Sequence, residues 1–128
     1  MSFLRIASAA AVLTALSAPA AAQHMNADVF YQRAMKLKSK GPLALFARKE
    51  LKALIAEVRA AGTQVRETRL AAERVGKRGR YCPPKMKREM GHEEYLKGIG
   101  AIPAGERRRI DMVEATTRML ATKYPCKG

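Results

Sequence analysis

The feature that most constrains the fold is a pair of cysteines, Cys82 and Cys126, in a chain whose first 22 residues look like an export signal. Residues 1–22 contain one basic residue, Arg5, then a short apolar run, then small residues that end at Ala22. This order is typical of a cleavable signal peptide, and the apolar run is too short to span a bilayer. We therefore expect cleavage after Ala22 and a periplasmic mature chain without a stable membrane anchor. In such an oxidising compartment an even number of cysteines favours pairing, and we predict a Cys82–Cys126 disulfide.

The mature chain, residues 23–128, has the length of a single domain with a modest core. An intramolecular disulfide stabilises such a domain by roughly 4 kcal/mol in the chain-entropy model. The alternatives for the two thiols are an intermolecular disulfide, free thiols and a metal site. A metal site is disfavoured, because there is no Cys-x-x-Cys motif and only His24 and His92 could complete the ligand set.

The net charge of the chain is strongly positive. The 25 lysines and arginines outnumber the 11 aspartates and glutamates, which gives a formal charge of +14 at pH 7. Such an excess fits an anionic partner, which could be nucleic acid, lipid headgroups, an acidic protein or an acidic envelope polymer. It also fits a solvated helical surface with no specific ligand. Export argues against nucleic acid as the partner.

The mature chain predicts an all-α fold, because good helix formers dominate it and no stretch alternates with a period of two. Asn26 is expected to cap a first helix, which Gly41 ends. Residues 43–46 are expected to form an apolar turn that leads into the longest helix, residues 49–75. Small residues at positions 61–62 indicate the close approach of another helix. The narrow apolar seam of the long helix also suits a dimer.

Two shorter helices follow, the first over residues 92–99. The second begins at Asp111, which forms a variant of the capping box with Glu114. Met112 and Met119 share one face of this helix, which predicts core packing rather than a metal-binding surface. The expected fold is a small bundle of four to five helices with one disulfide.

Catalytic motifs are absent from the sequence. The segment His92-Glu93-Glu94 lacks the second histidine that a zinc-binding helix needs one turn later. Neither a nucleophile-elbow motif nor a phosphate-binding Gly-rich loop is present. A cysteine held in a disulfide cannot act as a thiolate nucleophile. We therefore expect a binding protein, with no enzymatic activity, no cofactor and no metal.

The segment between the long helix and residue 89 is the strongest candidate for a binding site. It is rich in basic residues, contains Pro83 and Pro84, and has no acidic residue before Glu89. These features predict an exposed loop, and the cysteine within it would reduce the entropy lost on binding. The expected partner-binding residues are Lys77, Arg78, Arg80, Tyr81, Lys85, Lys87 and Arg88.

Two further groups of arginines serve as comparisons for this loop. Residues 107–109 form a short basic cluster, which is either a second contact or a solvated turn. Arg59, Arg66 and Arg69 lie on the long helix. If the loop is the contact site, reversing its charges should weaken binding more than reversing those three charges on the helix.

The C-terminal half resembles the Rap/Tai group, the periplasmic immunity proteins of type VI secretion amidase effectors. The resemblance covers residues 81–126 and rests on Tyr81-Cys82-Pro83-Pro84, Tyr95-Leu96, Ile102-Pro103, Ala115, Leu120-Ala121 and Tyr124-Pro125-Cys126. It implies a small helical fold, the disulfide and a frequent homodimer. It also implies that a loop of the protein plugs the active-site groove of a secreted peptidoglycan amidase. Members of that group commonly carry another cysteine and a first helix with Gly-Tyr, which this chain lacks.

The sequence thus predicts a periplasmic binding protein of the immunity type, which inhibits a secreted peptidoglycan amidase by occluding its active site. Its partner would be a protein, with a homodimer as a further expectation. The alternative is a general basic envelope protein that binds an anionic polymer or a lipid surface through its arginines and has no toxin partner.

Overall fold

The computed structural model describes residues 23–86 and 88–127, and this part of the chain is all-helical. The predicted signal peptide, Lys87 and Gly128 lie outside the described residues. The elements in chain order are α1 (Ala27–Ser39), the 3₁₀ helix η1 (Gly41–Phe46), α2 (Arg48–Arg74), α3 (His92–Gly100), α4 (Ala104–Arg107) and α5 (Met112–Lys123). The predicted all-α class is therefore confirmed, and the short α4 lies between the two shorter helices that the sequence predicts.

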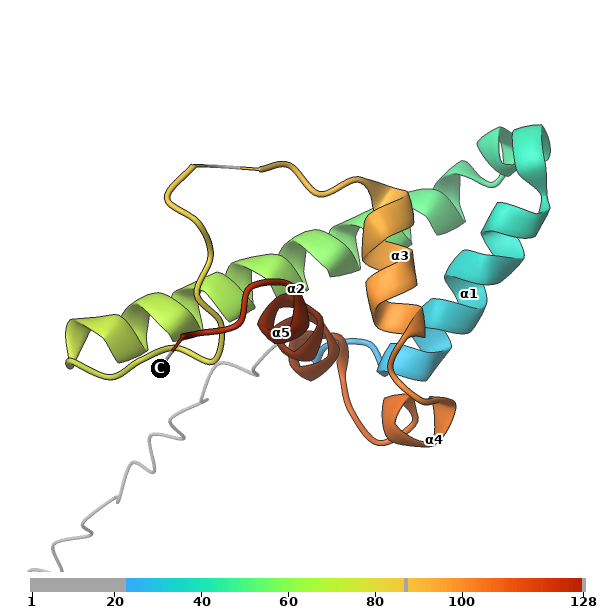
Figure 1. The fold of residues 1–128 in the computed structure, drawn as a ribbon. Coiled ribbons are helices and arrows are strands. Elements are labelled where there is room, and N and C mark those ends of the chain that lie inside the picture. Colours follow the sequence, from blue (N-terminus) through green and yellow to red (C-terminus); the bar gives the residue numbers. More distant parts are fainter. Residues whose placement is uncertain (1–22, 87, 128) are drawn as a thin grey trace, which may run out of the picture.

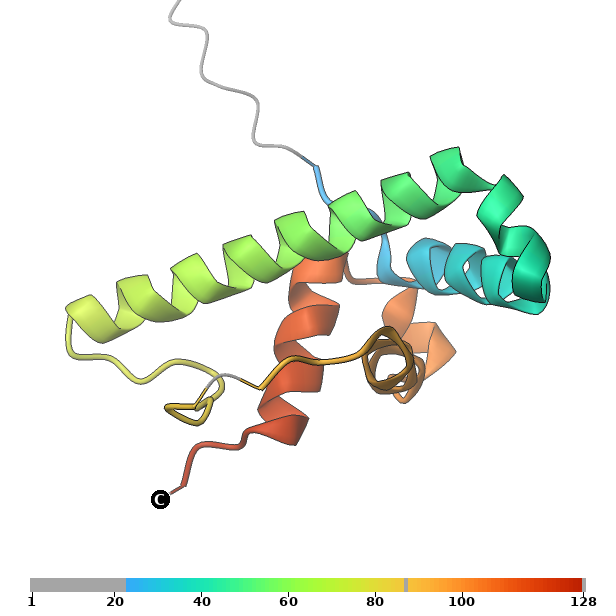
Figure 2. The same cartoon turned by 90° about the horizontal axis from the view of Figure 1, so that it is seen from above.

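The long helix α2 organises the molecule (Figure 1). It runs along the whole body, with α1 and η1 at one end and the α2–α3 loop at the other. Figure 2 shows α5 starting against the middle of α2 and running away from it on one side, and these two helices make the most extensive contact between elements. α3 packs against both α1 and α5. The η1 end and the loop end of the molecule are therefore far apart.

Local capping signals set the helix boundaries. The Asn26 side chain accepts hydrogen bonds from the backbone N–H groups of Asp28 and Val29, at 3.0 and 3.2 Å. The Asp111 carboxylate accepts one from the N–H of Glu114, at 2.9 Å. Gly41 adopts a φ of 54°, a left-handed conformation that glycine tolerates best and that turns the chain from α1 into η1. These three predicted boundary residues are confirmed.

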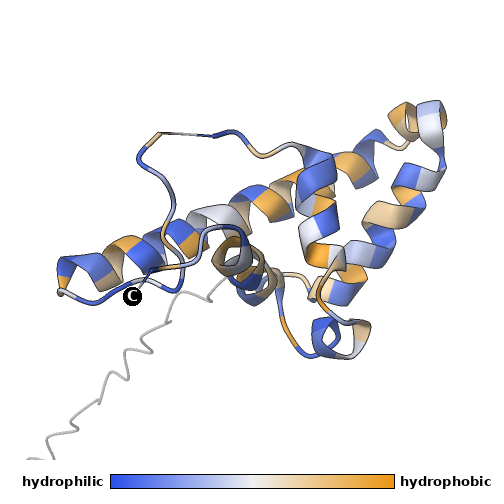
Figure 3. Ribbon diagram, viewed as in Figure 1, coloured by the Kyte–Doolittle hydropathy of each residue, from blue (hydrophilic) through white to orange (hydrophobic). Residues whose placement is uncertain are grey.

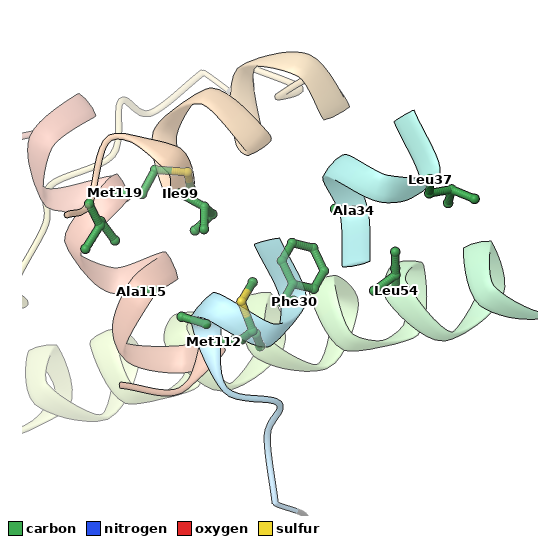
Figure 4. Close-up of a cluster of buried hydrophobic side chains, with 11 residues drawn as sticks. Phe30, Ala34, Leu37, Leu54, Ile99, Met112, Ala115 and Met119 are labelled. Atoms are coloured by element: carbon green, nitrogen blue, oxygen red, sulfur yellow. The ribbon is translucent and has the colours of Figure 1, made fainter. Parts of the chain in front are cut away.

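The core lies where α1, α2, α3 and α5 meet, and Figure 4 shows its side chains. Ile99 and Met112 are its largest fully buried side chains, and Met119 is 7% exposed. Both methionines therefore fill the core, as predicted. On α2, Ala61 is fully buried, whereas a Cβ at Gly62 would have no neighbour within 4 Å. The expected close approach therefore occurs at Ala61 and does not involve Gly62.

Candidate functional site

The α2–α3 loop, residues 75–91, forms an arc outside the helical body (Figure 1). Gly76 adopts a φ of 74° and ends α2 in the left-handed conformation typical of helix C-termini. The side chains of the predicted contact residues Lys77, Arg78, Arg80, Lys85 and Arg88 are exposed. Lys87 lies outside the described residues. The loop therefore presents a dense cluster of positive charge to solvent.

The disulfide attaches the middle of this loop to the segment that follows α5. Cys82 and Cys126 are bonded within one chain, with their Cα atoms 4.9 Å apart. The backbone N–H of Cys82 also donates a hydrogen bond to the carbonyl oxygen of Tyr124, at 2.8 Å. The predicted intramolecular pairing is confirmed. This bond holds the basic side chains on a covalently restrained backbone.

Tyr81, one of the predicted contact residues, is only 6% exposed. Its ring packs against α2, where the Arg69 guanidinium lies 5.4 Å from the ring centroid. Arg69 also forms an ion pair with Glu73 at 2.7 Å. Gly79 lies so close to this arginine that an added Cβ would be 2.7 Å from its Cγ atom. Tyr81 therefore supports the loop from beneath and offers little surface to a partner.

This packing also changes the role of Arg69, which the sequence places among the helix arginines remote from the loop. Burial acts to lower the pKa of Arg69, but hydrogen bonding to Tyr81 and Glu73 outweighs it and raises that pKa. The guanidinium is therefore a fixed positive charge under the loop. Reversal of Arg69 would disturb the loop itself, so this residue cannot serve as a control site that lies away from the loop.

A second ionic network joins the loop to α5. The Arg80 guanidinium donates two hydrogen bonds to the Glu114 carboxylate, at 2.6 and 3.0 Å. Arg118 donates to the same carboxylate at 2.9 Å and to Glu106 at 2.9 Å. Arg80, and secondarily Arg118, hold the pKa of Glu114 at about 2, below its ordinary value of 4.5. Arg80 thus helps to fix the loop on α5, although its side chain remains 59% exposed.

This depressed pKa predicts a specific pH dependence of stability. The ionised Glu114 stabilises the folded chain fully above about pH 5, and this contribution is lost as the pH falls toward 2, the folded pKa. The coupling between Arg80→Gln and Glu114→Gln in a double-mutant cycle should be about 1 kcal/mol at pH 7, should fall steeply toward pH 2 and should vanish below it. Urea unfolding across this pH range measures it. A coupling that is independent of pH would contradict this account.

A small pocket of about 270 Å³ lies between α2, the base of the loop and α5. Three arginines, Arg69, Arg78 and Arg80, contribute to its wall. The Nε atom of Arg69 is buried and, within the described part of the chain, has no hydrogen-bond partner. A buried donor without a partner carries a desolvation cost. Glu114 also lines this pocket and pairs with Arg80. Arg69 pairs with Glu73, so both of these arginines already have a carboxylate partner.

The arginines at positions 107–109 do not form one surface cluster. Arg107 is 6% exposed. It donates to Asp28 at 3.0 Å and to the backbone carbonyl oxygens of residues 100 and 102, at 3.2 and 2.6 Å. The side chain of Arg108, in contrast, is 68% exposed. Arg107 therefore has a structural role, and neither alternative expected for the cluster applies to it.

Across residues 23–86 and 88–127, no three histidine, cysteine, aspartate or glutamate side chains come together in a way that could hold a metal ion. In the same part of the chain, no helix combines the length and apolar character needed to cross a membrane.

Comparison of the chain with protein-family models, curated proteins and solved structures finds no match. The resemblance to the Rap/Tai group therefore rests on the residues between positions 81 and 126. The geometry adds a basic loop that is exposed at its surface, packed on α2 at its base and bonded to the end of the chain.

Proposed function

We propose that the chain is a periplasmic binding protein of the immunity type. In this proposal it inhibits a secreted peptidoglycan amidase by inserting the α2–α3 loop into the active-site groove. The observation that carries the proposal is the disulfide-restrained basic loop, with Cys82 bonded to Cys126. A restrained loop loses less conformational entropy on binding than a free one, which favours tight occlusion of a groove. The resemblance to the Rap/Tai group supports the amidase as target.

The mode of recognition follows from the charges of the loop. Exposed lysines and arginines on this loop would steer it toward an acidic rim around the groove, which raises the association rate. Binding should weaken as salt concentration increases, because salt screens the steering charges.

A matched pair of triple variants tests the role of the loop. Reversal of Lys77, Lys85 and Arg88 to Glu changes three exposed loop charges and leaves the Arg80–Glu114 pair intact. We expect this variant to lose at least about tenfold in affinity, mainly through slower association. The target would be captured from an envelope extract, identified by mass spectrometry and purified, and its binding kinetics measured by surface plasmon resonance.

The control is the reversal of Arg59, Arg66 and Arg109 to Glu, which makes the same change in net charge at exposed sites outside the loop. Circular dichroism should show the same helical content in both variants. Equal losses of affinity would contradict contact through the loop. They would favour the alternative function, in which the whole basic surface binds an anionic polymer or lipid and there is no toxin partner.

A further inference from the structure

A second unusual surface lies at the opposite end of the molecule, where η1 connects α1 to α2 (Figure 1). Leu43, Leu45 and Phe46 are 64%, 68% and 87% exposed. Figure 3 shows the apolar colour of η1 at this corner of the molecule. We call these three side chains the apolar tip. Exposed apolar side chains that lie together in this way usually mark an interaction site.

The orientation of η1 is the reverse of what core packing alone would favour. Its small residue Ala44, together with Ala47 just after it, packs against the core, while the three large side chains face solvent. Burial of a leucine or phenylalanine contributes roughly 1.5–3 kcal/mol, whereas alanine contributes much less. Folding stability therefore does not explain why the large residues of η1 point outward.

Basic residues flank η1 on both sides in the sequence. Lys36 and Lys38 lie in the last turn of α1, and Lys40 precedes η1 directly. Between positions 36 and 52 the sequence has six basic residues and a single carboxylate, Glu50. That carboxylate accepts hydrogen bonds from Arg33 at 2.6 and 2.7 Å, so its charge is already compensated. The basic residues are Lys36, Lys38, Lys40, Arg48, Lys49 and Lys52. Lys38 forms an ion pair with Glu93 of α3 at 2.7 Å, so the other five carry most of the positive charge near η1.

We propose that the apolar tip docks the protein reversibly on an anionic lipid bilayer. The three apolar side chains would enter the boundary between headgroups and acyl chains, while the flanking lysines contact the lipid phosphates. Charge complementarity favours an anionic bilayer over a second copy of the chain as the partner, because contact between two tips would bring the basic residues of both chains close together. The tip is a convex corner (Figure 2), and a fluid bilayer can adapt to such a shape.

This inference is independent of the proposed inhibition of an amidase. The apolar tip and the basic loop lie at opposite ends of α2, so a chain docked through η1 keeps its loop exposed. Three apolar side chains provide only weak attachment, so binding should be reversible and sensitive to salt. Docking would hold the protein at the bilayer surface without a permanent anchor.

Vesicle co-sedimentation tests the proposal with the chain that begins at Gln23, which contains every described residue. We expect binding to vesicles of phosphatidylcholine mixed with phosphatidylglycerol, and at least about tenfold weaker binding to phosphatidylcholine alone. The variant Leu43→Ser/Leu45→Ser/Phe46→Ser should bind the anionic vesicles at least about tenfold more weakly than the wild-type chain. All three side chains are exposed, so the variant should fold normally.

The control variant is Val75→Ser/Met86→Ser, which removes two apolar side chains, 70% and 82% exposed, at the loop end of the molecule. It should bind the anionic vesicles as the wild-type chain does. The proposal is overturned if the wild-type chain binds neither kind of vesicle or binds both equally. It is also overturned if the control variant loses as much affinity as the tip variant. It is also overturned if the tip instead mediates a dimer, seen by light scattering, or binds an acidic protein while the vesicles stay unbound.

Discussion

Replacement of Arg107 by methionine is expected to lower the free energy of unfolding by about 3–5 kcal/mol. Methionine keeps much of the apolar stem but removes the guanidinium, which packs 4.2 Å from the centroid of the Tyr31 ring. The variant leaves the Asp28 carboxylate without its buried partner and strips two backbone carbonyl oxygens of their donor. Removing one member of a buried ion pair is costly, because the remaining charge stays desolvated. Urea unfolding monitored by circular dichroism measures the change.

The neighbouring residue provides a matched control. Arg108 is also an arginine beside Asp28, but its Nε atom lies 3.9 Å from the carboxylate and its side chain is 68% exposed. Arg108→Met should therefore change stability by about 0.5 kcal/mol or less. Similar losses in the two variants would show that Arg107 is no more important than a surface arginine.

Loss of the disulfide is the second large effect that we expect. Cys126→Ser should lower the free energy of unfolding by about 2–5 kcal/mol, because the unfolded chain regains the freedom of the closed loop. The link spans 44 positions and joins the α2–α3 loop to the segment that follows α5. Under the proposed function, affinity for the target should also fall in conditions where the variant is fully folded, since the loop would then have to be ordered on binding.

The double variant Cys82→Ser/Cys126→Ser and the reduced wild-type chain serve as controls for the disulfide. Both should show the same loss of stability as the single variant, as measured by thermal unfolding with and without reductant. If the single variant is much less stable than the double variant, the remaining free thiol itself destabilises the folded chain. Unchanged stability in all three would contradict the structural role of the bond.

The parts of the fold that depend on local interactions could be predicted from the sequence. Asn26 and Asp111 cap helices by contacts with residues two or three positions away, and Gly41 ends α1 through its own backbone conformation. Helix α2 was expected over residues 49–75 and spans Arg48–Arg74. Such signals need no knowledge of the tertiary structure.

The parts that depend on distant contacts could not be predicted. Arg107 is buried because Asp28, 79 positions away in the sequence, accepts its hydrogen bond. Tyr81 is buried because the loop folds back onto Arg69. Composition alone predicted exposed side chains at Arg107 and Tyr81. The partners that bury them come from other elements, and no local pattern in the sequence identifies those partners.

The candidate site was therefore predicted only in its general features. The basic character of the loop and its bond to Cys126 followed from composition, cysteine count and compartment. The support beneath the loop, from Arg69 and from the Arg80–Glu114 pair, depends on how α2 and α5 are packed. For the same reason the sequence indicated an apolar turn at residues 43–46 but not that its large side chains face solvent.

The most direct test of the central claim is an inhibition assay with the protein captured from the envelope extract, which we expect to be a secreted peptidoglycan amidase. Hydrolysis of purified peptidoglycan is measured while the chain that begins at Gln23 is added in increasing amounts. We expect stoichiometric inhibition that is competitive with peptidoglycan fragments. The triple reversal at Lys77, Lys85 and Arg88 should reduce this inhibition. The triple reversal at Arg59, Arg66 and Arg109 should leave it unchanged. Full amidase activity in the presence of excess chain would contradict the proposed inhibition.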